Sequence, residues 1–173
     1  AVDYESAGAE VIQNVYETLV WYDGSSASCL IPVLATEVPT VANGGISADG
    51  MNYTFNIRGG VTFHDGTDLT AEDVAYSVQR VLRIHDLSSP AWILEQAMTA
   101  YVAWYVGATV NDWALSMDVP QWLLDGAGLT APDHVLDESD VQAVAEFMVT
   151  EEDAMTVNFR LTKPYPAFLR ICA

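Results

Sequence analysis

The chain has 173 residues, of which 51% are hydrophobic and 17% are charged. This length and hydrophobicity suit one ordinary domain with a sizeable core and exclude an intrinsically disordered chain. Six Lys and Arg stand against 24 Asp and Glu, so the formal net charge is −18. Such a surface repels a phosphate backbone and an anionic lipid surface, so no nucleic-acid partner is expected. The count fits an acidic exported protein better than adaptation to high salt.

The first third of the chain predicts one helix and one clear strand. Apolar residues at helical spacing predict an amphipathic helix over residues 6–20, which Asp23 and Gly24 end. Residues 24–35 are interpreted as a loop, and residues 38–41 as a short edge strand that a proline interrupts.

Alternating apolar residues predict a strand over residues 53–58. A short return over residues 61–63, followed by a turn over 64–66, indicates that this strand belongs to a meander.

The next helix has a complete start signal. Thr70 is the candidate N-cap with Asp73 three residues later, and Leu69 and Val74 occupy the positions of a hydrophobic staple. An apolar stripe over residues 74–82 then indicates that the helix packs against another element.

The middle of the chain is rich in aromatic residues. Ser89 and Pro90 are typical of a helix start, and the apolar pattern extends that helix towards Gly107. Residues 107–135 are interpreted as loop-rich with one short helix over residues 121–124.

The last third predicts a β-hairpin and a final helix. Residues 137–140 offer an acidic helix start or a turn. A first strand is expected over residues 144–149, a turn over 150–153, and a second strand at the alternating apolar positions from 155 to 161. A new helix opens at Ala167.

The sequence offers no catalytic or metal-binding constellation. His64, His85 and His134 are dispersed, without metal-ligand spacing. No carboxylate pair stands in an apolar setting, and the nucleophile-elbow, P-loop and dinucleotide motifs are absent. We therefore expect no enzyme activity, no metal and no cofactor. Cys29 and Cys172 leave one long-range disulfide and two free thiols equally open.

Targeting signals are not evident. The chain opens without an initiator Met or a signal peptide, and its last helix has no cap, which indicates a processed or excised piece. The longest apolar stretch, residues 97–110, is shorter than the ~20 residues that span a bilayer. Asn52-Tyr53-Thr54 matches the N-glycosylation sequon, which matters only in an exported protein.

Three stretches together resemble the family 5 extracellular solute-binding proteins, the oligopeptide, dipeptide and nickel receptors of ABC importers. Their order and spacing match the family. They are VYETLV at 15–20 with IPVLA at 31–35, DGMNYTFNIR at 49–58 continuing through VTFHDG at 61–66 into LTAEDVAYS at 69–77, and LTKPYPAFL at 161–169. The chain departs from the family where an aromatic residue is usual near Val38, and its segment 101–135 is longer and more aromatic than expected.

The resemblance implies a mixed α/β (α+β) fold, the N-terminal part of a two-lobed periplasmic-binding-protein type II fold with antiparallel β-hairpins and packed helices. Residues 1–36 would start lobe I, residues 37–163 would form a small β-rich subdomain with a helical insertion, and residues 164–173 would return into lobe I. Family members are much longer, so the chain is expected to be a truncated fragment without the second lobe.

The resemblance also implies a function. A non-enzymatic, monomeric component of an ABC importer would capture peptides or a similar small solute outside the membrane and deliver it to permease subunits. Two lobes would close on a ligand that binds the closed state more tightly. Its place would be extracellular or periplasmic, with membrane contact only through a missing lipoprotein anchor. The alternatives are a ligand-sensing receptor lobe of a signalling system and a nickel-chelate receptor; an acidic hydrolase lacks any catalytic grouping.

Three residues match ligand-facing positions of the family. Tyr4 and the helix start around Ala9 match a segment that lines the cleft, and Trp92 matches an aromatic residue that faces the ligand. An aromatic wall beside a helix N-terminus favours a peptide or small chelate with an anionic group. A core position for Trp92 is an equal alternative. His64 lies in the family's own turn motif and indicates a hairpin, not nickel binding.

Overall fold

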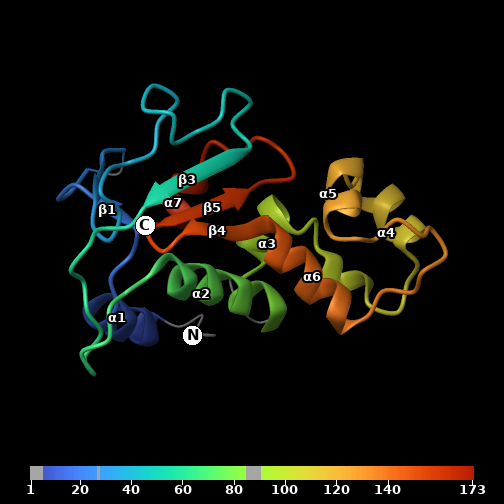
Figure 1. The fold of residues 1–173 in the computed structure, drawn as a ribbon, viewed down its shortest axis with the longest axis horizontal. Coiled ribbons are helices and arrows are strands. Elements are labelled where there is room, and N and C mark those ends of the chain that lie inside the picture. Colours follow the sequence, from blue (N-terminus) through green and yellow to red (C-terminus); the bar gives the residue numbers. More distant parts are fainter. Residues whose placement is uncertain (1–5, 27, 85–90) are drawn as a thin grey trace.

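A three-stranded antiparallel sheet lies at the centre of the molecule (Figure 1). The computed structural model describes residues 6–26, 28–84 and 91–173. The strands are β3 (Asn52–Asn56), β4 (Val149–Asp153) and β5 (Thr156–Arg160), in the order β3-β5-β4. Tyr53 and Phe55 of β3 are buried and pair with Phe159 and Val157 of β5. The predicted strand at 53–58 and its alternation are therefore confirmed.

The predicted meander is wrong, because β3 pairs with a strand one hundred residues later. Residues 61–69 instead form a local loop, in which Thr62 and Asp68 pair in an isolated antiparallel bridge. The backbone N–H of Phe63 donates to the carbonyl of Thr67 over 2.8 Å. The sheet partner of β3 is chosen by burial, since the Phe55 and Phe159 rings meet edge to face at 5.5 Å.

A second sheet, β1 (Val20–Tyr22) with β2 (Leu30–Pro32), corrects the prediction for the N-terminal region. Helix α1 covers Ser6–Val15 and ends five residues earlier than predicted, and part of the predicted loop over 24–35 is a strand. Leu19 is buried, and its carbonyl accepts the N–H groups of Val33 and Ala35. These long-range hydrogen bonds hold the chain after α1 extended. The edge strand expected over 38–41 does not form.

Helix α2 (Ala71–Ile84) begins where the capping signal predicts. The Asp73 carboxylate accepts the backbone N–H and the hydroxyl of Thr70 over 2.9 and 2.8 Å. The helix buries Ala71, Ala75 and Leu82 and packs against β4, β5 and helix α6. The prediction that this helix packs against another element is confirmed, although within the predicted stripe Leu82 is buried and Val74 and Val78 are only partly buried.

The long helix predicted up to Gly107 is interrupted. Helix α3 (Trp92–Met98) ends before Ala100 and Tyr101, whose φ angles are +47° and +58°, and a 3-10 helix, η1 (Val102–Tyr105), follows. The indole N–H of the buried Trp113 donates to the carbonyl of Ala100 over 2.9 Å. This hydrogen bond fixes the backbone at the break. The predicted start at residues 89 and 90 lies outside the described residues.

Two helices lie farther from the sheet (Figure 1). Helix α5 (Gln121–Gly126) is the predicted short helix, whereas α4 (Val110–Met117) replaces part of the expected loop. Thr109 and Asp112 form a reciprocal capping box that starts α4, and Trp113 anchors it in the core.

Helix α6 (Glu138–Met148) corrects the predicted hairpin. Its start is the acidic segment singled out in the sequence, with a capping box between Asp137 and Asp140. The expected first strand, 144–149, is helical up to Met148, because Val144, Ala145 and Met148 line one buried helical face. The hairpin turn consequently falls at residues 154–155 instead of 150–153.

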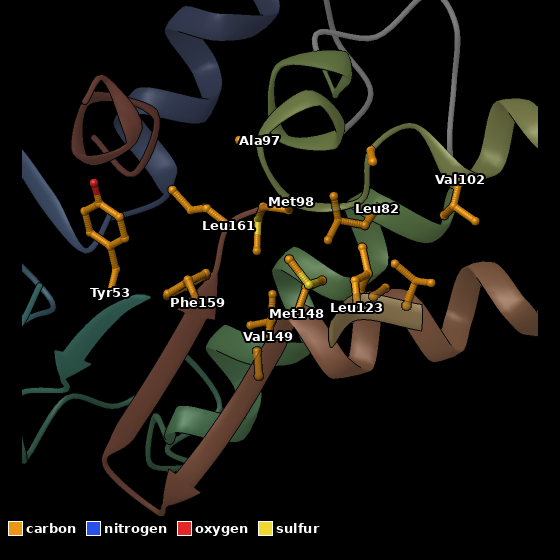
Figure 2. Close-up of a cluster of buried hydrophobic side chains, with 14 of the residues drawn as sticks. Tyr53, Leu82, Ala97, Met98, Val102, Leu123, Met148, Val149, Phe159 and Leu161 are labelled. Carbon is orange, nitrogen blue, oxygen red and sulfur yellow. The ribbon is translucent and has the colours of Figure 1, made fainter. Parts of the chain in front are cut away.

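The core gathers side chains from the sheet, α2, α3 and α6 (Figure 2). Met98, Met148 and Leu161 lie between the helices and the sheet in this view. The short helix α7 (Phe168–Ile171), predicted from residue 167, adds Phe168, whose ring lies 4.7 Å from that of Tyr53. The mixed α/β fold with antiparallel strands is confirmed, while the lobe boundaries 1–36, 37–163 and 164–173 stay a prediction.

Candidate ligand-binding surface

The three residues predicted to face a ligand are only partly described. Tyr4 lies outside the described residues. Ala9 is exposed in α1, and Trp92, the first residue of α3, is 43% exposed. Trp92 is therefore not a core residue, and the ligand-facing role of all three stays a prediction.

An aromatic pair, the half-buried Tyr101 and the exposed Trp104, lies just after α3. The two rings are 5.8 Å apart between centroids with an angle of 75° between their planes. Trp104 is 55% exposed, although its indole N–H points inward and donates to the Glu95 carboxylate over 3.0 Å. Glu95 itself is only 2% exposed. This buried carboxylate therefore fixes the orientation of an exposed ring.

The surroundings of Tyr101 are apolar and negatively charged. Burial, followed by the charges of Glu95 and Tyr165, raises the pKa of the Tyr101 hydroxyl. Sequence reasoning missed this cluster. The available signal was that Glu95 is the single charged residue in the aromatic stretch 91–106.

A cavity of about 510 Å³ opens between the end of α1, the loop 61–69, α2 and α7. Neither Ala9 nor Trp92 lines it. Its polar groups include Glu17, His64 and Asp73. Its apolar wall includes Leu19, Leu34, Val74, Val78, Leu94, Phe159, Phe168 and Ile171. A wall of this kind buries apolar surface and offers few groups for chemistry.

A second cavity, of about 390 Å³, lies between α2, α6 and β4 and is lined by Glu72, Glu146 and Glu151. Across the described parts of the chain, no group of three or more His, Cys, Asp and Glu side chains is arranged to hold a metal ion. His134 is occupied elsewhere, because its Nε2 lies 2.8 Å from the Asp140 carboxylate.

Both cysteines are free thiols, which decides between the two alternatives that the sequence left open. Cys29 is exposed, whereas Cys172 lines the larger cavity. Burial raises the pKa of the Cys172 thiol to about 12, so this thiol stays protonated at neutral pH. Among the helices that the structure describes, none has the length and apolar character needed to cross a membrane.

Comparison with known proteins identifies the class of protein. Residues 30–173 match the family described as bacterial extracellular solute-binding proteins, family 5 Middle. The chain belongs to this family.

Individual relatives agree with this assignment. The periplasmic murein peptide-binding protein MppA of Escherichia coli is 29% identical over 95% of the chain and 23% of its own length. The structure of MppA gives a TM-score of 0.56 at 27% identity, covering all of the chain and 26% of MppA. Di/tripeptide-binding protein 2 of Pseudomonas aeruginosa is 35% identical over 43% of the chain and 16% of its own length.

The fold is that of the periplasmic binding proteins. A periplasmic oligopeptide-binding protein of Borrelia burgdorferi superposes with a TM-score of 0.62 at 20% identity, covering 99% of the chain and 26% of that protein. The chain spans about a quarter of the length of MppA and of these solved structures, and still less of the Pseudomonas relative.

Proposed function

We propose that the chain is part of the substrate-binding component of an ABC importer, which captures peptides or a similar small solute outside the cytoplasmic membrane and delivers it to a permease. The observation that carries this proposal is the family match over residues 30–173. The names of MppA and of the Pseudomonas relative, which refer to murein peptides and to di- and tripeptides, support peptides as the solute.

The described surface supports binding of a ligand. The exposed aromatic residues Trp92 and Trp104, with the half-buried Tyr101 beside Trp104, offer large rigid contact faces of the kind used to bind ligands. No catalytic role is proposed for any residue, and the ligand leaves chemically unchanged.

The finer features of the proposal concern the protein at its full length. Residues 1–36 and 164–173 belong to lobe I, and residues 37–163 form a β-rich subdomain with a helical insertion. A second lobe closes over the ligand, because a ligand shifts the equilibrium only towards the state that it binds more tightly. The protein acts as a monomer, held at the membrane by a lipid anchor.

Isothermal titration of the full-length protein with tri-alanine, di-alanine and a nickel–histidine chelate tests this function. We expect saturable binding of a peptide, and mass spectrometry of the released peptide should recover its original mass. Binding of the nickel chelate alone would replace peptides by nickel as cargo. Cleavage of the peptide, or no binding of any probe, would overturn the proposed function.

A further inference from the structure

The aromatic pair Tyr101–Trp104 forms a corner that is exposed at Trp104 and half-buried at Tyr101, and its geometry is set from inside the protein. The indole nitrogen of Trp104 is held at 3.0 Å by the buried Glu95 carboxylate, while more than half of its surface stays exposed. The Tyr101 ring stands at 75° to it. A ring with its polar edge fixed inward presents a preoriented face to solvent.

The backbone that forms this corner is strained. Ala100 and Tyr101 both have positive φ angles, which residues with a side chain adopt only rarely. Two such residues in succession end α3 and bring Tyr101 beside Trp104, and the hydrogen bond from Trp113 to Ala100 holds them there. Strain of this kind is typical of binding sites, where the surrounding structure has to hold it in place.

The charged group that the structure places at the corner is negative. It is the Glu95 carboxylate, within a chain of net charge −18. Tyr101 responds to this field, since the Glu95 charge raises its pKa in addition to the effect of burial. Aromatic faces attract cations through their quadrupole, and a nearby carboxylate strengthens that attraction.

We propose that the Tyr101–Trp104 corner, held by Glu95, binds a cationic group of the ligand, an alkylammonium or a guanidinium. This inference rests on the proposed function and adds to it a preference among peptides. Glu95 is a positioning residue that acts through Trp104, whereas Trp104 and Tyr101 contact the cation.

The test compares two peptides that differ only in charge. Ala-Lys-Ala and Ala-norleucine-Ala have side chains of similar length, and only the first carries a side-chain ammonium. Titration of the full-length protein at low salt should give about 5- to 30-fold tighter binding of the lysine peptide, the range expected for a partly desolvated cation–π contact. N-acetylated forms of both peptides show whether the side chain or the terminal ammonium is the group bound.

Three variants assign the preference to the corner. Trp104→Ala should abolish the preference, so that the lysine peptide binds no more tightly than the norleucine peptide, and saturable binding of the norleucine peptide shows that the fold is intact. Glu95→Gln keeps an acceptor for the indole and should reduce the preference. Tyr76→Ala is the matched control, because Tyr76 is also 55% exposed, and its ring already lies 5.7 Å from the Arg83 guanidinium carbon.

The outcomes separate this inference from the proposed function. A protein that binds both peptides equally, with or without acetylation, refutes the cation site and leaves peptide binding intact. A preference that survives Trp104→Ala places the cation elsewhere and equally refutes the site. If both peptides lose affinity in Trp104→Ala, and N-acetylation of the peptides removes that loss, the corner holds the terminal ammonium. Binding of neither peptide would overturn the proposed function itself.

Discussion

Replacing Gly126 by Ala tests the packing of α5 against α6. A Cβ atom at residue 126 would lie 2.0 Å from Cζ of Phe147, well inside the roughly 3.5–4.0 Å at which carbon atoms make favourable contact. The Phe147 ring cannot move freely, because it packs at 6.1 Å from the Trp122 ring and 4.8 Å from the guanidinium carbon of Arg160. Arg160 also donates a hydrogen bond to the Phe147 carbonyl.

The expected cost follows from three contributions. Overpacking a well-filled site costs about 1–3 kcal/mol, and a lost cation–π contact near the surface costs about 0.5–1 kcal/mol. Alanine in place of glycine in a helix returns up to about 1 kcal/mol. The net loss, after subtraction of about 1 kcal/mol, is about 0.5–3 kcal/mol, equivalent to a roughly 2- to 150-fold increase in the open population of this region.

Native-state hydrogen exchange on the full-length protein measures that population directly. Peptides covering α5 and α6 should exchange about 2- to 150-fold faster in Gly126→Ala. Gly59→Ala is the control, because a Cβ there meets no atom within 4 Å and the backbone angle suits alanine. Unchanged or slower exchange in Gly126→Ala, with the control also unchanged, would show that the ring has room and refute the packing argument.

Three further predictions concern charge and chemistry. With a net charge of −18, the melting temperature should rise between 0.1 and 1 M NaCl, as the screening length falls from ~10 to ~3 Å; a flat or falling trend contradicts a role for charge repulsion. Hydrogen bonds from the side chain and backbone of Ser139 hold the pKa of Asp137 below its ordinary 3.8, so its contribution to stability is present above that value and is lost as the pH falls through the lower folded pKa. Asp137→Asn should therefore reduce the fall in the free energy of unfolding at acid pH, measured by urea titrations at several pH values. An equally large fall in the variant would disprove this prediction. The Cys172 thiol, which is only partly exposed and whose pKa burial raises to about 12, should react with iodoacetamide far more slowly than Cys29 at pH 8, so Cys29→Ser should remove the fast phase, and a remaining fast phase would show that Cys172 itself is reactive.

Elements with a strong local signal could be predicted from the sequence. Helix α2 begins at Ala71 because Asp73 accepts two hydrogen bonds from Thr70, and that pairing needs only a three-residue spacing. Strand β3 follows from alternation at Tyr53 and Phe55. The family was also evident, because the longest of its motif stretches, residues 49–77, covers β3 and the start of α2.

The candidate site was predicted less completely. Trp92 was singled out and is exposed, whereas Glu95 and Trp104 were interpreted only as part of an apolar helix. The helical pattern hides the break at Ala100 and Tyr101, because propensity alone favours continuation through two residues with no glycine between them. The hydrogen bond from Trp113, thirteen residues away, overrides that preference.

The sequence by itself determined the caps, the alternating strand, the acidity and the family, since each depends on residues close together or on composition. Tertiary structure alone decided where α1 ends, that residues 144–148 are helical, and that β3 pairs with β5. A short apolar run fits the periodicity of a helix and of a strand equally well. It adopts the conformation that buries its apolar side chains against another element. That partner, as with Phe159 for Phe55, comes from a distant part of the chain.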